Sequence, residues 1–486
     1  MVAVGAVGEA RARLWLRTDA PGPFLVEIRT SSGVRSALIP DRRAHGDDGT
    51  LAFTIPDDAP DIGPLAPATE HAFRITAAPT GAVIGEGRFE TAPVPGSRGG
   101  FAFAFLSCHQ PFRPDGSVHP DSARMLAALE PALEARSVKY ALMIGDQIYA
   151  DAPARRRLLR TDSERPLLGL SVEAIRSRYQ ARYRRFWDFP EMQQLQARRA
   201  TWCMWDDHEI VDDWGARRVH TRPAWRRVFE GARRAFIDYQ ISRTMAIGSP
   251  PPAFHNAFTW GPAATFVMDL CSQRGFDGRT ARVYGEDQLA ALAEFLHEQR
   301  SRPVVFVVLT VPPVYLPDGL VGLGERVPGQ GAVFNARWNA RQNRRSLDAL
   351  LHVLRAHRRA APATKLALLC GDVHAGSATA LCWPGGERAY QFVSSPVTNA
   401  GRDWKEHLAD RLSFTMGHVR HGAERLAVTR LPCAGSEQRN PFSGLNAGVV
   451  FVGEEGAGAA SLRFELITYD ERAPGAARVA YDSGPL

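Results

Sequence analysis

The chain has 486 residues, 45% of them apolar and 23% charged, and its formal net charge is +7. This is the composition of an ordinary soluble globular protein, and the length exceeds what one core usually fills, so two domains are expected. The longest apolar run, Val304 to Leu309, is too short to cross a bilayer, and the basic residues follow no zinc-finger spacing or aromatic interleaving, so we expect no membrane span and no specific nucleic-acid recognition.

The first ninety or so residues show the alternation of short β-strands. Apolar residues occupy every second position at Leu14 and Leu16, at Phe24, Val26 and Ile28, at Phe73 and Ile75, and again at Phe89. Turn-rich spacers such as DAPGP and DIGPLAP separate these segments. We therefore predict a small antiparallel β-sandwich of immunoglobulin or fibronectin type over residues 1–93, followed by the linker PVPGSRGG.

From residue 101 to 486 the pattern changes to apolar strands separated by helical segments. Predicted strands are Phe101–Leu106, Tyr140–Ile144, Thr201–Trp205, Ala264–Leu270, Val304–Thr310 and Leu366–Cys370, with later ones at Gly448–Glu454 and Ser461–Tyr469. Predicted helices are Ser122–Arg136, Val172–Phe186, Trp225–Ser242, Glu286–Arg300 and Asn335–His357. Alternating strands and helices indicate a layered α/β domain.

Four of these strands stop abruptly at polar residues. The stretches are Ser107-Cys108-His109 after FAFAFL, Gly145-Asp146-Gln147-Ile148-Tyr149 after YALMI, Asp206-Asp207-His208-Glu209 after TWCMW, and Gly371-Asp372-Val373-His374 after LALLC. Buried parallel strands carry their ligand-binding residues at one edge of the sheet. We expect these side chains to meet there.

Three carboxylates gathered at one edge need a cation between them or raised pKa values. Asp146, Asp207 and Asp372 are the three, and a cation is the simpler answer. Cys108 and Tyr149 bind metals as anions, and with Asp146 and His374 they would suit a ferric ion, with zinc as a weaker alternative. Asp207 and Asp372, with Asp146 as a bridge, would hold Ca²⁺, Mg²⁺ or Mn²⁺.

Two cations that share a carboxylate can hold both the attacking and the leaving oxygen at phosphorus. We therefore expect hydrolysis of a small phosphorylated substrate by a metal-bound hydroxide. His208 lies one residue from a predicted ligand and is expected to protonate the leaving alcohol. Arg274, on the loop after the strand that ends near Asp269, is a candidate for binding the substrate phosphate.

The set GDQIYAD, WDDHE, GDVH and the upstream SC resembles the alkaline phosphatase D (PhoD-like) family of metallophosphoesterases. The resemblance extends to the N-terminal β-rich segment ending in FETAP and to FVSSP at 392–396, and so covers most of the chain. It implies a layered metallophosphoesterase-type β-sandwich flanked by helices. It also implies a secreted phosphomonoesterase or phosphodiesterase with an iron and calcium centre.

The resemblance assigns roles to individual residues. Its metal ligands fall on Cys108, on Asp146 as the bridge, on Tyr149 at the iron, and on Asp372 and His374. WDDHE resembles the GNHE motif of the wider superfamily, which places Asp207 at a ligand position and His208 at the catalytic imidazole. The chain departs from the pattern where Val311-Pro312-Pro313 replaces a usual histidine and Asp212-Asp213 replaces a frequent pair of asparagines.

Other features bear on location and on rival functions. The start, MVAVGAVGEARARLWLRT, lacks a secretion signal, which favours a cytoplasmic location, although a chain from which a signal had been cleaved would look the same and would be secreted or periplasmic. The six cysteines show no paired spacing and are expected to be reduced. A metal-dependent hydrolase of carbonyl esters or lactones, and a metal-stabilised binding protein, are the alternative functions.

Overall fold

The structure is a computed structural model that describes residues 1–31, 33–153, 158, 167–278, 280–326, 334–401, 414, 417–455 and 459–486. Among these residues, no helix has the length and apolar character needed to span a bilayer. All six cysteines are free, as the sequence predicted.

Two antiparallel sheets form the N-terminal part, in agreement with the alternation of apolar residues there. One sheet has the order β1-β2-β5, with β1 at Val2–Val7, β2 at Ala12–Arg17 and β5 at Thr50–Ile55. The other has the order β4-β3-β6-β7, with β3 at Phe24–Thr30, β4 at Gly33–Ile39, β6 at Glu70–Ala77 and β7 at Ala82–Glu90. Every second residue of β3 and β6 is buried, which is the pattern of a strand with one face on a core.

A six-stranded mixed sheet follows, in the order β10-β9-β8-β21-β22-β23. Its strands are β8 at Phe101–Leu106, β9 at Val138–Ile144, β10 at Ala200–Met204, β21 at Ala447–Glu455, β22 at Ala459–Tyr469 and β23 at Ala477–Asp482. β8, β9 and β10 are parallel and in register at their carboxyl ends, since Leu106 pairs with Met143 and Ile144 with Met204. Their polar extensions therefore leave the sheet at one edge.

An eight-stranded mixed sheet has the order β11-β12-β15-β16-β18-β17-β20-β19. Its strands are β11 at Asn256–Trp260, β12 at Ala263–Val267, β15 at Val304–Leu309, β16 at Lys365–Cys370, β17 at Ser377–Cys382, β18 at Arg388–Val393, β19 at His418–His421 and β20 at Glu424–Arg430. The central strands β12, β15, β16 and β18 are parallel. A separate hairpin pairs β13, Gly275–Asp277, with β14, Thr280–Arg282.

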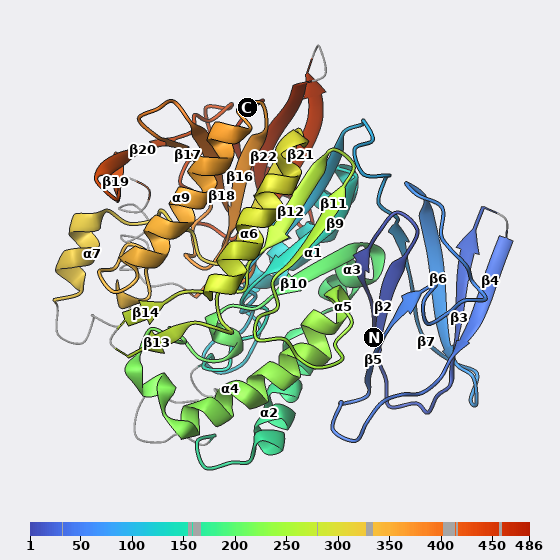
Figure 1. Cartoon of the computed structure of the whole chain (residues 1–486). Coiled ribbons are helices and arrows are strands. Elements are labelled where there is room, and N and C mark those ends of the chain that lie inside the picture. Colours follow the sequence, from blue (N-terminus) through green and yellow to red (C-terminus); the bar gives the residue numbers. More distant parts are fainter. Residues whose placement is uncertain are drawn as a thin grey trace.

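The helices flank these sheets (Figure 1). They are α1 at Pro120–Ala135, α2 at Val172–Phe186, α3 at Pro190–Arg198, α4 at Pro223–Phe236, α5 at Ser242–Thr244, α6 at Glu286–Glu298, α7 at Asp318–Gly324 and α9 at Arg344–Ala360. Short helical turns cover Asp207–Glu209, Arg218–Thr221, Ile237–Ile241 and Gln299–Ser301. Helix α2 coincides with its prediction, and the Ser171 hydroxyl caps its first turn.

One helix prediction was wrong at its start. The sequence pattern placed a helix from residue 335, whereas α9 begins only at Arg344. The side-chain amide of Asn343 donates to the carbonyl oxygens of Asn335 and Arg337, each at 2.8 Å, and so holds this segment in turns. Asparagine competes with helical hydrogen bonds in this way because its short side chain reaches nearby backbone groups.

The two large sheets pack face to face through aromatic side chains. Phe103 of β8 meets Phe306 of β15 edge-on at 5.1 Å between ring centroids, and Phe392 of β18 stacks on Phe464 of β22 at 4.7 Å. The apolar runs of β15 and β16 are buried on both faces, because their alternate residues belong to this inner core and to a second core under α6 and α9. Such two-sided burial explains why these strands read as continuous apolar runs.

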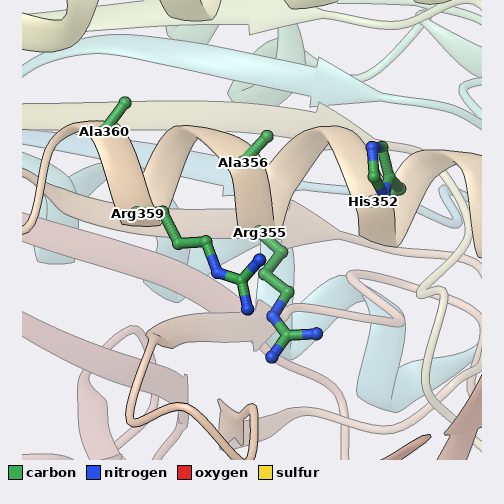
Figure 2. Close-up of a pocket in the computed structure, with 5 residues that line it drawn as sticks. All are labelled: His352, Arg355, Ala356, Arg359 and Ala360. Atoms are coloured by element: carbon green, nitrogen blue, oxygen red, sulfur yellow. The ribbon is translucent and has the colours of Figure 1, made fainter.

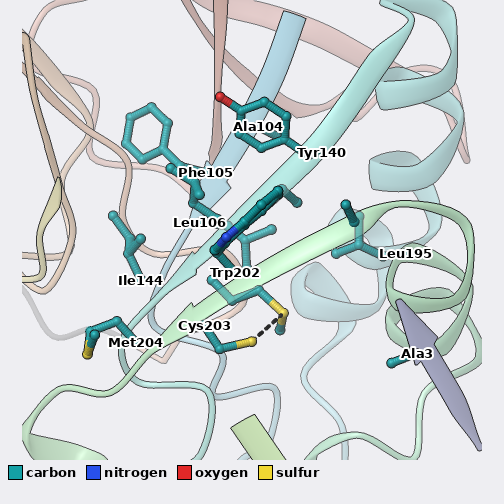
Figure 3. Packing of buried hydrophobic residues seen from close by; sticks show 14 of the residues in the cluster. Ala3, Ala104, Phe105, Leu106, Tyr140, Ile144, Leu195, Trp202, Cys203 and Met204 are labelled. Carbon is teal, nitrogen blue, oxygen red and sulfur yellow. Dashed lines mark hydrogen bonds between the residues drawn. The ribbon is translucent and has the colours of Figure 1, made fainter. Parts of the chain in front are cut away.

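The N-terminal strands are joined to this core by specific contacts. The Thr201 hydroxyl of β10 donates to the Val4 carbonyl of β1 at 2.6 Å, and the Trp15 indole donates to the Asp238 carbonyl at 2.8 Å. In Figure 3, Ala3 of β1 lies near the same buried cluster as Leu195 and Trp202. The inner core thus extends from the small sheets to the strands that carry the polar motifs.

Candidate metal centre

The four polar stretches meet at the shared carboxyl edge of the two large sheets. The chain after β18 crosses to the end of β8, where the Val397 amide donates to the Ser107 carbonyl at 2.9 Å. Four predicted ligands have left-handed backbones, with φ of 59° at Cys108, 56° at Asp146, 62° at Asp372 and 54° at His374. Non-glycine residues adopt this conformation rarely, and when they do so they are concentrated at functional sites.

Cys108, Asp146, Tyr149 and His374 form one connected group. The thiol of Cys108 lies 3.3 Å and the hydroxyl of Tyr149 lies 3.2 Å from the same oxygen of Asp146, Oδ2. The Tyr149 hydroxyl is also 3.4 Å from Nε2 of His374. The structure therefore brings together the four residues that the sequence predicted for a ferric site.

Residues of the segment after β18 support this group, and the sequence pattern alone did not identify them as partners. The Ser395 hydroxyl donates to the Cys108 sulfur at 3.1 Å and accepts from the His374 amide at 3.1 Å. The Asn399 side-chain amide lies 3.2 Å from Nε2 of His374. The FVSSP resemblance was the only signal that pointed to this segment, and it did not extend to Asn399.

Asp207 lies at the centre of a second, acidic group. It forms sets with Asp146 and His208, with Asp206 and Asp372, and with Asp212 and Asp213, and in each set potential ligand atoms lie within 4.8 Å of one another. Asp206 Oδ2 and Asp207 Oδ1 are buried and have no hydrogen-bond partner among the described residues. A buried carboxylate oxygen without a donor is costly, so these atoms fit a bound cation.

The electrostatics of the acidic group lead to the same conclusion. Burial, reinforced by the Asp372 carboxylate, raises the pKa of Asp207 to about 7. Burial and Asp213 raise the pKa of Asp212 to about 6, and burial with neighbouring acidic groups raises the pKa values of Asp146 and Asp206 well above the ordinary range. Without a cation, this site would retain protons at a pH where exposed aspartates are ionised.

Arg337 is a member of the site that the sequence did not suggest. Its guanidinium donates to Asp372 Oδ2 at 2.8 Å. Burial by itself would lower the pKa of Arg337, but the Asp372 carboxylate outweighs burial and the net pKa is raised. Arg337 therefore offsets the charge of one predicted ligand.

His208 is held in a defined orientation by Asp151 and Tyr149. Its Nδ1 lies 2.7 Å from Asp151 Oδ1, and its ring stacks on that of Tyr149 with centroids 4.0 Å apart. Burial lowers the pKa of His208, but Asp151, Asp146 and other nearby carboxylates outweigh it and raise the pKa well above its usual value. An imidazolium oriented in this way can donate a proton. Asp151, the last residue of GDQIYAD, was not singled out from the sequence.

Glu209 and Arg274 lie outside the acidic group. The Glu209 carboxylate accepts from the backbone amides of Asp146 at 2.8 Å, Gln147 at 2.7 Å and Asp206 at 3.0 Å, so it fixes two of the loops to each other. The Arg274 guanidinium donates to the Ala336 carbonyl at 2.6 Å and lines a neighbouring cavity.

A groove along α9 is unrelated to this site. Figure 2 shows His352, Arg355 and Arg359 along it. The two arginines form ion pairs with Glu387, and Arg355 also pairs with Glu424. Because these charges are compensated on the surface of the helix, we do not place the reaction there.

The sequence pattern of the PhoD-like phosphatase family matches residues 103–428. The chain belongs to the PhoD-like phosphatase family. This membership and the layered α/β fold with small N-terminal sheets confirm the resemblance and the fold class that the sequence predicted. A search of curated proteins found no match.

Two solved structures share the fold. A structure of PhoD superposes with a TM-score of 0.63 at 14% identity over 98% of this chain and 91% of that chain. A purple acid phosphatase, PPD1 from yellow lupin seeds, superposes with a TM-score of 0.57 at 12% identity over 98% of this chain and 73% of that one.

The raised pKa values predict how the stability of metal-free protein depends on pH. The Asp207 carboxyl titrates near 3.8 when unfolded and at about 7 in the folded site. Between these values the folded state keeps a proton that the unfolded state has lost, so the free energy of unfolding falls as pH rises. In chelator-treated protein we expect a lower urea midpoint at about pH 7 than at about pH 5. This difference between the two pH values should be smaller in Asp207→Asn. It should be unchanged in the control Asp188→Asn, because Asp188 is exposed. If the urea midpoint changed with pH by the same amount in all three proteins, the prediction would be contradicted.

Proposed function

We propose that this protein hydrolyses phosphate esters at a dinuclear metal centre. The observation that carries the proposal is the position of Asp146 between the two groups. Its Oδ2 is within 3.3 Å of Cys108 and Tyr149, while Oδ1 accepts from the His208 amide at 3.3 Å and its carboxylate lies in one set with Asp207. A single carboxylate placed in this way can serve two cations. Membership of a phosphatase family supports a phosphate ester as the substrate.

The side chains favour two different metals. Cys108, Asp146, Tyr149 and His374 would hold Fe³⁺, and Asp146, Asp207 and Asp372 would hold Ca²⁺, with Mn²⁺, Mg²⁺ and Zn²⁺ as the alternatives. When bound, such a pair neutralises phosphate oxygens and lowers the pKa of water. The remaining steps belong to the protein. His208 donates a proton to the leaving oxygen, Asp151 orients the imidazole, and Arg337 limits the negative charge beside Asp372.

Substrate comparison tests the reaction class. Metal-loaded protein should release phosphate from p-nitrophenyl phosphate or nitrophenol from bis-p-nitrophenyl phosphate, and should turn over p-nitrophenyl acetate much more slowly. Asp146→Asn should lose more than about 100-fold of this activity because it weakens both cation sites at once. The exposed control Asp188→Asn should keep it. Cleavage of the acetate alone would indicate a carbonyl hydrolase, and no cleavage of any ester would indicate a binding protein.

Metal identity has an optical readout that does not depend on activity. A Tyr149 phenolate and a Cys108 thiolate on Fe³⁺ should absorb visible light. We expect purified, iron-loaded protein to be coloured, and Tyr149→Phe to lose or shift the band while keeping its fold by circular dichroism. A colourless parent that contains only zinc or manganese would remove the iron assignment and leave phosphate hydrolysis intact.

The role of His208 predicts a dependence on the leaving group. His208→Asn should lower kcat by about 10² to 10⁴-fold for alkyl phosphates, whose alcohol needs a proton. The loss should be smaller for p-nitrophenyl phosphate, whose leaving group departs without one. His297→Asn, an exposed site on α6, is the matched control. An equal loss with both substrates would assign His208 to positioning instead of proton donation.

A further inference from the structure

An arginine-lined cavity lies beside the proposed metal centre and has a volume of about 280 Å³. Its guanidinium groups belong to Arg217, Arg226, Arg274 and Arg282. They come from the loop after the Asp207 turn, from the start of α4, and from the region of the β13–β14 hairpin (Figure 1). No aspartate or glutamate is among the described residues that line it. The cavity is therefore strongly basic although it adjoins an acidic site.

Most of these arginines lack a carboxylate partner. Arg217 pairs with Asp213 at 3.0 Å, whereas Arg226, Arg274 and Arg282 form no ion pair with any residue in the described part of the chain. Arg274 and Arg282 each donate one hydrogen bond to a backbone carbonyl, of Ala336 at 2.6 Å and Gln273 at 2.7 Å. A guanidinium has five N–H donors, so most of them remain available to a ligand.

The pKa of buried His220, one of the lining residues, reflects the positive charge of the nearby arginines. Burial, together with the charges of Arg217 and Arg274, lowers the pKa of His220 to about 3. Nδ1 of the neutral ring accepts a hydrogen bond from the Gly215 amide at 2.9 Å, and the ring stacks on that of Trp214 with centroids 4.9 Å apart. The Trp214 side chain is only 1% exposed, so it offers no free ring face for a planar ligand. The arginines of the lining therefore favour an anionic ligand.

The cavity and the metal centre share one loop. The Asp213 amide donates to Asp207 Oδ2 at 2.6 Å, while the Asp213 carboxylate accepts from Arg217. Gly215 follows in the left-handed region at φ +76°, and a Cβ there would lie 2.7 Å from Cγ of Arg274. Only glycine lets Arg274 approach this loop so closely. A ligand could therefore contact the arginines and the centre together.

We propose that this cavity binds a second phosphoryl group of the substrate while the first lies at the metal centre. The inference rests on the proposed phosphatase function and adds to it a class of substrate, namely compounds with two phosphoryl groups. Planar guanidinium groups match phosphate oxygens in pairs, and several uncompensated cations suit a dianion better than a neutral alcohol. Arg274, predicted from the sequence to bind phosphate, contributes to this second position.

The test compares phosphate release from AMP with release from ADP and adenosine 3′,5′-bisphosphate by metal-loaded protein. We expect kcat/KM for at least one of the two-phosphoryl compounds to exceed that for AMP by about tenfold or more, which is about 1.4 kcal/mol. Arg226→Ala and Arg282→Ala, tested separately, should each reduce this ratio. Arg178→Ala, at an exposed arginine on α2, should leave it unchanged.

The outcomes separate this inference from the function on which it rests. If the parent releases phosphate from AMP but shows no preference, or if neither cavity variant alters a preference that exists, the second phosphoryl site is wrong and the phosphatase function stands. If metal-loaded parent releases no phosphate from the three compounds or from p-nitrophenyl phosphate, and no nitrophenol from bis-p-nitrophenyl phosphate, both proposals fail. Circular dichroism of each variant establishes that a changed ratio does not come from unfolding.

Discussion

The central constraint on this molecule is the crowding of carboxylates in a place that water hardly reaches. Asp207 alone lies in three acidic sets, and its pKa of about 7 shows how much burial opposes its charge. Like charges at this spacing are tolerated only when protons or cations separate them. The surroundings relieve part of the repulsion through Arg337, which pairs with Asp372, and through His208, which is flanked by Asp151 and Asp146. The repulsion that remains between the carboxylates would be relieved by bound cations.

The backbone adopts an unfavourable conformation at the carboxyl edge of the two large sheets. Cys108, Asp146, Asp372 and His374 all have positive φ, and each such residue costs on the order of 1–3 kcal/mol. These residues lie two to four positions beyond the ends of β8, β9 and β16, in each of which all residues but one are buried. A rigid core on both sides of a strand can impose an otherwise rare conformation on its last residues. The continuous apolar runs and the positive φ angles of the predicted ligands are therefore two parts of one arrangement.

Local signals explain which parts could be predicted from the sequence. An apolar run that ends in a polar motif is visible within ten residues, so the strands and the positions of Cys108, Asp146 and Asp372 could be predicted. Arg337 and Asn399 could not, because neither lies in a strand-end motif. Ser395 lies in FVSSP, just after β18, where the family resemblance marked the segment but not the contact with Cys108. The start of α9 was missed for a related reason, since the Asn343 side chain bonds backward to Asn335 in a way that apolar periodicity does not reveal.

The distribution of charge around the Asp207 loop connects these features. On one side the loop faces carboxylates that need cations, and on the other side it faces arginines that lack carboxylates, with the Asp213–Arg217 pair at the boundary. If structural balance were the only requirement, the arginines and aspartates could neutralise one another directly, as Arg176 of α2 and Asp238 do. Instead the geometry keeps most of them apart. Unpaired charges are costly where they are buried, as they are at Arg274 and at the aspartates around Asp207. A phosphorylated ligand that contacted both the arginines and metal ions held by the aspartates would reduce this cost on both sides of the loop.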